Sequence, residues 1–103
     1  MPRWAKRADG NQAEIVAALR KAGYQVLDFH QAGFGVPDLL VCAKVDYGDT
    51  LARWSCWVEV KKPGELLTQA ERQFFDKAPG QKIIVYDAAG AVSKLQMARA
   101  VRE

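Results

Sequence analysis

Two runs of strand-forming residues separated by a short turn constrain the fold of this chain more than any other feature. Residues 39–45 and 54–60 are rich in β-branched and aromatic side chains, and turn-forming residues with Gly48–Asp49 at their centre lie between them. A two-residue loop at Gly48–Asp49 predicts an antiparallel hairpin in which Val41 lies opposite Cys56. A loop of another length would shift this register and change which side chains meet.

The predicted register brings three charged residues together at the end of the hairpin away from its turn. Asp38 lies opposite Glu59, and Lys61 shares their face because side chains alternate along a strand. Opposed carboxylates repel each other by roughly 0.2–1 kcal/mol, and one hard cation such as Mg²⁺ offsets that repulsion. A neighbouring lysine can orient or deprotonate water and neutralise phosphate charge. These three residues therefore predict metal-assisted hydrolysis of a phosphodiester, with Asp38, Glu59 and Lys61 as the catalytic residues.

The same residues resemble a nuclease signature. Pro37-Asp38 followed by Glu59-Val60-Lys61 resembles the PD-(D/E)xK motif. The preceding glycine, Gly35, and the continuation Lys-Pro-Gly-x-Leu-x-Thr over residues 62–68 are similar to the VRR-NUC branch, a virus-type replication and repair nuclease domain. The resemblance extends from about residue 11 to residue 85, which is most of the chain.

The resemblance implies a function and a set of ligands. It implies a restriction-endonuclease-like core, a Mg²⁺-dependent DNA endonuclease with Mn²⁺ as a substitute, branched or Holliday-junction DNA as a candidate substrate, and a homodimer. In the resembling nucleases a glutamate of the first helix reaches the metal. The implied metal ligands here are the side chains of Glu14, Asp38 and Glu59 and the carbonyl of Val60. A purely structural role is the alternative for Glu14, as the capping-box partner of Asn11.

The helix after the hairpin departs from the family pattern. Thr68 is expected to cap this helix, and family members often carry glutamine three residues later, where this chain has Glu71. Three residues are therefore candidate helix partners of the site. Gln69 or Gln73 substitutes for the family glutamine, or Glu71 serves as well as completing a capping box with Thr68.

Basic residues and a glycine-rich loop are the candidates for nucleic-acid contact. The loop over residues 31–35 is expected to edge the active site, because glycine lets the backbone approach a ligand closely. A frayed terminus is the alternative for the basic arm at residues 1–10, and a solvated charge is the alternative for Lys62. The predicted nucleic-acid-binding residues are Arg3, Arg7, Gly35 and Lys62.

Hydrophobic periodicity completes an α/β fold with a mixed sheet of about four strands flanked by helices, in the order αβββαβα. Ala70 and Met97 are expected to face inward from their helices, and His30 is expected to have a structural or surface role. Beside the hairpin, the sequence predicts helices over 11–22, 68–78 and 91–101, strands over 24–30 and 82–86, and a turn over 87–90.

Length and composition fit one domain over residues 1–103. The net charge of +3 permits an acidic partner without requiring one, and no apolar run approaches the ~20 residues of a membrane span. Cys42 and Cys56 do not form a CxxC pair, so they are expected to be reduced core residues without zinc. The expected location is the cytoplasm of a bacterial or phage-infected host cell, with DNA as partner and no membrane.

Two other functions compete with the nuclease. One is a nucleic-acid-binding module of the same fold that has lost catalysis. The other is a small structural protein in which Asp38 and Lys61 form only a salt bridge. Cleavage of DNA that depends on Mg²⁺ discriminates between these interpretations.

Overall fold

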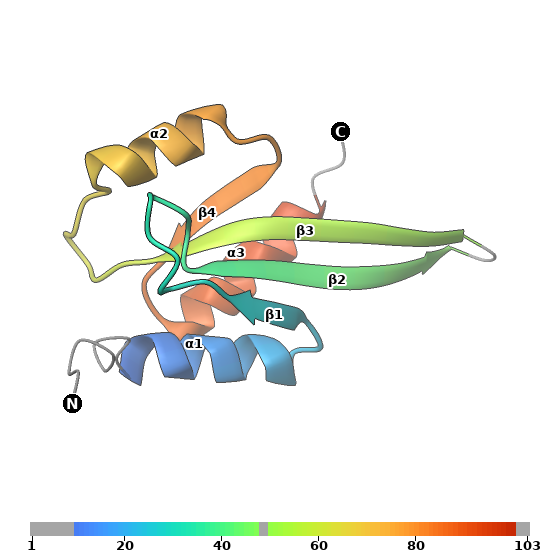
Figure 1. Ribbon diagram of the computed structural model, residues 1–103. Coiled ribbons are helices and arrows are strands. Elements are labelled where there is room, and N and C mark those ends of the chain that lie inside the picture. The colour runs from blue at the N-terminus through green and yellow to red at the C-terminus, as the bar shows by residue number, and fades with distance from the viewer. Residues whose placement is uncertain (1–9, 48–49, 101–103) are drawn as a thin grey trace.

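The computed structural model describes residues 10–47 and 50–100, which form an α/β fold with a four-stranded mixed sheet and three helices (Figure 1). The predicted order αβββαβα and the mixed sheet are confirmed. The elements are α1 (Gly10–Lys21), β1 (Gln25–Asp28), β2 (Leu39–Tyr47), β3 (Thr50–Val60), α2 (Gln69–Lys77), β4 (Gln81–Val85) and α3 (Ala88–Ala100).

The sheet has the strand order β1-β2-β3-β4 and is built around the β2–β3 hairpin. Strands β1, β2 and β3 pair antiparallel, and β4 joins β3 in parallel after the connection through α2. Val41 lies opposite Cys56, and Tyr47 opposite Thr50 is the last pair before the turn. The predicted register is therefore confirmed, while residues 48–49 themselves lie outside the described part of the chain.

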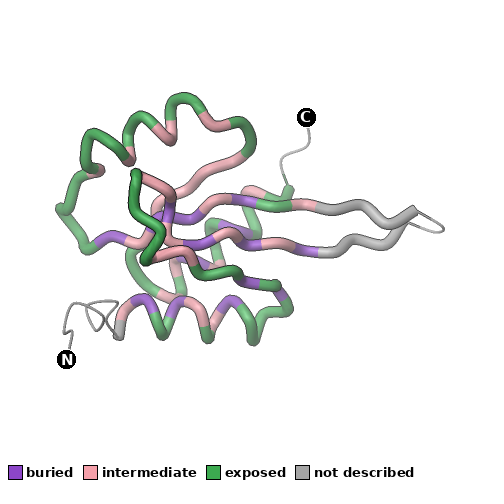
Figure 2. The backbone as a smooth tube through the Cα atoms, in the orientation of Figure 1, coloured by how far each residue is buried: buried purple, intermediate pink, exposed green. Residues whose placement is uncertain are grey.

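The hydrophobic core lies between one face of the sheet and the helices α1 and α3 (Figure 2). Alternate residues of the strands point into it, so that Leu39 and Val58, which are paired across the hairpin, are both fully buried. Glu59, the next residue after Val58, consequently points to the opposite face of the sheet. The buried core residues are Ile15, Leu19, Tyr24, Val26, Leu39, Val41, Ala43, Cys56, Val58, Val85, Ala91 and Leu95.

Helix α1 ends at a glycine, as the sequence predicts. Gly23 has φ +101°, and the N–H groups of Gly23 and Tyr24 donate to the carbonyls of Arg20 and Leu19. These two bonds form a Schellman motif, which satisfies the last carbonyls of the helix. The prediction for the other end was wrong, because α1 already contains Gly10 and Asn11, so Asn11 is not its cap.

Helix α2 lies on the opposite face of the sheet and packs against it through few side chains. No residue of α2 is buried, and Ala70, which was expected to face inward, is exposed. The main aromatic contact is edge-to-face, between Trp57 of β3 and Phe74 of α2, with ring centroids 5.2 Å apart. This face of the sheet is therefore the more accessible one, and it is the face that carries Glu59.

Helix α3 begins three residues earlier than predicted. The N–H of Gly90 donates to Oδ1 of Asp87 at 2.7 Å, and the N–H of Ala91 donates to the carbonyl of Asp87 at 2.9 Å. Asp87 thus caps the helix, and the predicted turn over 87–90 was wrong because a capping aspartate and a glycine also open helices. Met97 is 67% exposed, so its predicted inward position was also wrong.

Strand β1 is shorter than the predicted segment 24–30. The carboxylate of Asp28 accepts the backbone N–H of His30 at 3.0 Å, which turns the chain away from the sheet.

Cys42 and Cys56 are free thiols, and burial raises the pKa of Cys56 to about 12. Among the described residues, no helix is long and apolar enough to cross a bilayer.

Candidate functional site

The charged residues predicted from the motif meet at the start of β2 and the end of β3, on the face of the sheet that α2 covers. Asp38 precedes β2, and its Oδ2 accepts the backbone N–H of Val60 at 2.9 Å. Its own carbonyl accepts the N–H of Phe29 at 2.6 Å. These bonds join Asp38 to the end of β3 and to the segment after β1, so its carboxylate is held beside Glu59. Burial raises the pKa of Asp38 above its ordinary value, although the hydrogen bond from Val60 opposes that change.

Glu59 is the most deeply buried carboxyl group of the site. Its residue surface is 3% exposed, and its buried Oε1 accepts no hydrogen bond from any donor in residues 10–47 and 50–100. Burial, followed by the neighbouring charges of Asp38 and Glu71, raises the pKa of Glu59 to about 9. Glu59 therefore keeps a proton at neutral pH when no additional cation is near.

Lys61 is a buried ammonium group surrounded by carboxylates. Its Nζ lies 2.8 Å from Oε1 of Glu71, 3.8 Å from Oε2 of Glu59 and 3.7 Å from Oε2 of Glu65. Burial lowers the pKa of Lys61, but the hydrogen bond and charge of Glu71, then the charges of Glu59 and Glu65, outweigh this and raise it. In this state Lys61 is protonated, so it acts as a charge and a hydrogen-bond donor.

Glu71 is the residue of α2 that reaches the site. The hydroxyl of Thr68 accepts the N–H of Glu71 at 3.1 Å, and Oε1 of Glu71 accepts the N–H of Thr68 at 2.9 Å, so the predicted capping box is confirmed. Burial raises the pKa of Glu71, but the hydrogen bonds from Lys61 and Thr68 lower it by more, so the pKa lies below its ordinary value. Gln69 and Gln73 are exposed, which leaves Glu71 as the helix partner.

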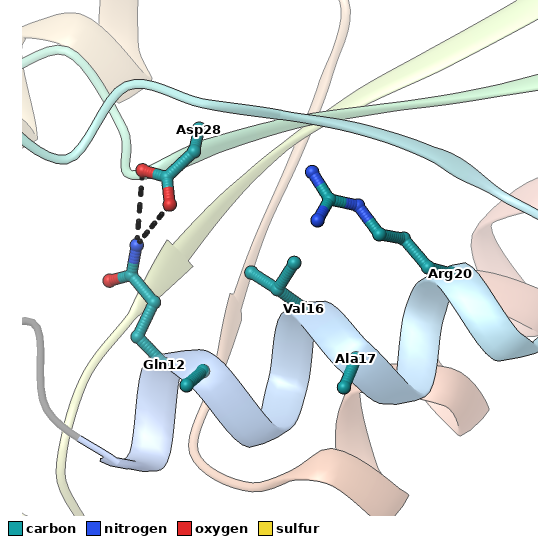
Figure 3. A pocket seen from close by; sticks show the side chains of 6 residues that line it. Gln12, Val16, Ala17, Arg20 and Asp28 are labelled. Atoms are coloured by element: carbon teal, nitrogen blue, oxygen red, sulfur yellow. Dashed lines mark hydrogen bonds between the residues drawn. The ribbon is translucent and has the colours of Figure 1, made fainter.

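The structure does not bring Glu14 to this site, contrary to the prediction. Glu14 is exposed, and it lies on the side of α1 opposite Gln12, since two residues correspond to about 200° around a helix. Gln12 is instead the buried polar residue of α1. Its Nε2 donates to both carboxylate oxygens of Asp28 at 3.3 Å (Figure 3).

A second polar cluster thus lies on the α1 side of the sheet, and sequence reasoning missed it. Nδ1 of His30 lies 2.7 Å from Oδ1 of Asp28, and Nε2 of His30 is buried without a hydrogen-bond partner among the described residues. Asp28 has a lowered pKa, because the hydrogen bonds from His30 and Gln12 and the charge of His30 outweigh the effect of burial. A shallow cavity of about 330 Å³ adjoins this cluster, lined by Gln12, Ala13, Val16, Ala17, Arg20 and Asp28 (Figure 3).

The predicted nucleic-acid-binding residues fall in different places. Lys62 is exposed directly after the site, and its N–H donates to Oε1 of Glu65 at 2.8 Å. Gly35 has φ +78°, and a Cβ atom on it would lie 2.3 Å from the carbonyl oxygen of Ala70. Only glycine therefore fits at position 35, where the loop packs against the first turn of α2. Arg3, Arg7 and the other residues of the predicted basic arm over 1–10 lie outside the described residues, except Gly10, which begins α1.

The donor set at Asp38 and Glu59 fits a hard divalent cation. Within residues 10–47 and 50–100, no three His, Cys, Asp or Glu side chains are grouped as a metal site. Mg²⁺ needs fewer protein ligands than that, because one or two carboxylates usually hold it together with water and phosphate. Asp38 and Glu59 supply two carboxylates, and Oε1 of Glu59 is a buried acceptor without a donor. The carbonyl of Val60, between Glu59 and Lys61 in the chain, is a third candidate oxygen.

The chain matches no family model, no curated protein and no solved structure. The resemblance to VRR-NUC domains therefore depends on the motif residues alone, between Gly35 and Asp38 and between Glu59 and Thr68.

Proposed function

We propose that this chain is a Mg²⁺-dependent DNA endonuclease in which Asp38 and Glu59 hold the metal and Lys61 acts on the scissile phosphate. The observation that carries this proposal is the excess of carboxyl groups over cations on the α2 face of the sheet. Glu59, Glu65 and Glu71 lie within 4 Å of a single ammonium group, that of Lys61. Asp38 lies beside Glu59, and the pKa of Glu59 rises to about 9 as a result of burial and of the charges of Asp38 and Glu71. Strongly perturbed carboxyl groups beside a charged partner are typical of functional sites.

A purely structural role explains this arrangement less well. The closest ion pair of Lys61 is with Glu71 at 2.8 Å, and the carboxylate of Asp38 is bonded to the N–H of Val60, so the site is not a simple Asp38–Lys61 salt bridge. Burying charged groups costs free energy that only well-matched partners repay. An additional carboxyl group held protonated adds nothing to such a pair, whereas a cation-binding site requires it.

The residues have distinct roles in the proposed reaction. Asp38 and Glu59, with the carbonyl of Val60, would hold Mg²⁺, which supplies charge for the phosphoryl oxygens and lowers the pKa of a bound water molecule. Because Lys61 is protonated, we assign it to orienting the attacking water and neutralising phosphate charge, and not to removing the proton. Glu71 holds the ammonium of Lys61 in place.

DNA is the proposed substrate, and the motif resemblance is the main support for that choice. Lys62 lies exposed beside the site and is a candidate phosphate contact. Branched or Holliday-junction DNA and a homodimeric assembly belong to the same proposal, since two sites suit a substrate with two strands to cut. Sedimentation of the protein alone checks the dimer, and a panel of linear and branched DNAs checks the substrate.

The decisive experiment is a cleavage assay with different metals. We expect cutting with Mg²⁺ and Mn²⁺, little cutting with Ca²⁺ because its looser coordination misplaces water and phosphate, and none in EDTA. DNA binding should weaken steeply with salt, since each phosphate neutralised contributes about −0.9 to the log–log slope on duplex DNA. Full activity in EDTA would contradict the proposal, and salt-sensitive binding without cleavage would identify an inactive nucleic-acid-binding module.

Variants connect the activity to the residues. Glu59→Gln should abolish cleavage and also abolish the rise in melting temperature that Mg²⁺ causes, because a neutral amide is a poor ligand. Lys61→Ala should keep the Mg²⁺-dependent rise and lose cleavage. The matched control is Asp76→Asn, which changes an exposed carboxylate of α2 and should cut like the wild type.

A further inference from the structure

Phe34 is the most exposed large apolar side chain among the described residues, and its backbone is unusual. The residue is 95% exposed and has φ +57°, the left-handed conformation that side chains other than glycine rarely adopt. It is the only residue other than glycine with a positive φ in the described part of the chain. Such outliers persist where the surrounding structure enforces them, and they gather at functional sites.

The surrounding structure does enforce the position of Phe34. The neighbours Gly33 and Gly35 have φ values of +76° and +78°, and Gly35 packs so closely against Ala70 that no Cβ atom fits between them. The loop is therefore fixed against the first turn of α2. The next residue of that turn is Glu71, which holds Lys61, so Phe34 projects from the structure that borders the carboxylate site.

A shallow groove beside Phe34 has the composition of a nucleic-acid surface. Its volume is about 370 Å³, and it combines the phenyl ring of Phe34 in the loop with a second phenyl ring, an amide and a lysine side chain along α2. Aromatic rings that stack on bases, together with cations that contact phosphates, are the usual elements of single-strand binding. The residues lining the groove are Phe34, Ala70, Gln73, Phe74, Lys77 and Ala78.

We propose that Phe34 stacks on an unpaired base of the bound DNA, while Lys77 contacts a phosphate of the same strand. This inference rests on the proposed function, and it specifies the substrate class as DNA with unpaired bases beside the cleaved phosphodiester. A fully paired duplex buries its bases in the stack and offers no exposed face to Phe34, so it should bind more weakly than DNA with a gap or a bulge.

The test measures binding in EDTA, which separates it from cleavage. Fluorescence anisotropy compares a duplex that contains a three-nucleotide bulge with the same duplex fully paired. Wild-type protein should prefer the bulged probe, and Phe34→Ala should lose about 5- to 150-fold in affinity for it, as expected for one stacked base, with little change on the paired duplex. Phe34→Tyr should keep the preference, and Phe34→Leu, which is apolar without a π face, should lose it.

Two other variants provide the contrast. Lys77→Ala should weaken both probes alike, because phosphate contacts carry no information about pairing. Met97→Ala removes another exposed apolar side chain, on α3, and should change neither affinity. Because Phe34 is 95% exposed, its variants should melt like the wild type, and a melting curve checks this.

The outcomes separate this inference from the proposed function. Equal losses on both probes, no loss on either, or no DNA binding at all would overturn the role of Phe34. A shift in the sedimentation of the DNA-free protein on Phe34→Ala would also overturn it, because Phe34 would then belong to a contact between two copies of the chain. Cleavage without any preference for unpaired bases would retain the nuclease and remove only the stacking contact.

Discussion

The carboxylate of Glu71 lies 2.8 Å from the ammonium of Lys61, and this ion pair connects α2 to the end of β3. The same carboxylate oxygen accepts the N–H of Thr68, the N-cap of the helix. Glu71 therefore stabilises the start of α2 and fixes a lysine of the site at the same time. One side chain thus makes both contacts, the capping box with Thr68 and the ion pair with Lys61.

The variant Glu71→Gln separates these two roles. Glutamine still accepts the N–H of Thr68 in a capping box, but it lacks the charge that holds Lys61. We expect cleavage to fall about tenfold or more, because the ammonium loses its closest partner and its fixed position, while the folded state remains intact. Cleavage rates at saturating Mg²⁺ and a thermal melt measure the two effects.

The comparison variant Glu71→Ala also removes the acceptor of the Thr68 N–H, while the hydroxyl of Thr68 still caps the helix. It should cost a further ~1 kcal/mol of stability, which is typical of losing one hydrogen bond. If Glu71→Gln cuts as fast as the wild type, Lys61 does not depend on Glu71 for its position.

Glu59 should make the metal-free protein less stable as the pH rises. Its pKa is about 9 in the folded state against an ordinary value of 4.5, so between these values the folded state binds more protons than the unfolded chain. Stability from this group is complete below about pH 4.5 and is lost towards pH 9, by up to about 1.4 kcal/mol per pH unit for one proton.

Urea unfolding in EDTA at pH 5, 7 and 9 measures this loss, and Glu59→Gln is the comparison. The amide does not titrate, so the variant should become the more stable of the two proteins as the pH rises. Added Mg²⁺ should restore the wild type at pH 8 and leave the variant unchanged. Parallel pH profiles for the two proteins would show that Glu59 ionises normally.

The hairpin and the residues on it were predictable from the sequence because their positions follow from strand periodicity and one turn. The two-residue loop fixes the pairing of Val41 with Cys56, and that pairing fixes the face on which Glu59 and Lys61 lie. The capping box between Thr68 and Glu71 was predictable because it is also a local pattern, which depends only on residues three apart.

The contacts between elements distant in sequence were not predictable in this way. Gln12 and Asp28 are 16 residues apart, and no local pattern indicates that they meet. Whether Gln12 or Glu14 faces the sheet depends on how α1 is rotated about its axis. Gln12 is buried, which shows that it is the one on the inner face. The sequence did not indicate this, because a polar residue on the inner face does not contribute to the apolar stripe from which helix orientation is predicted.

The placement of Glu14 gives a simple test of that rotation. Glu14→Gln should cut DNA at the wild-type rate, because the side chain is exposed on the side of α1 away from Gln12. Asp38→Asn is the positive comparison and should remove most of the cleavage, because it replaces one of the two carboxylates that would hold the metal with a neutral amide. A large loss in Glu14→Gln, in the same assay, would mean that α1 turns towards the metal when DNA binds.

Gly35 is in close contact with the first turn of α2. Gly35→Ala introduces a Cβ atom 2.3 Å from the carbonyl oxygen of Ala70, and a backbone carbonyl cannot rotate away as a side chain can. The first turn of α2 must therefore shift, and Glu71 shifts with it. We expect lower stability in urea unfolding and a loss of cleavage even in the fraction that remains folded.

Gly33→Ala is the matched control for this variant. Gly33 has nearly the same φ, +76° against +78°, but nothing lies within 4 Å of its added Cβ atom. Both variants incur the strain of a left-handed alanine, about 1–2 kcal/mol, and only Gly35→Ala displaces α2. Cleavage per folded molecule should therefore be retained in Gly33→Ala and lost in Gly35→Ala. Equal activity in both variants would show that the site does not depend on where α2 begins.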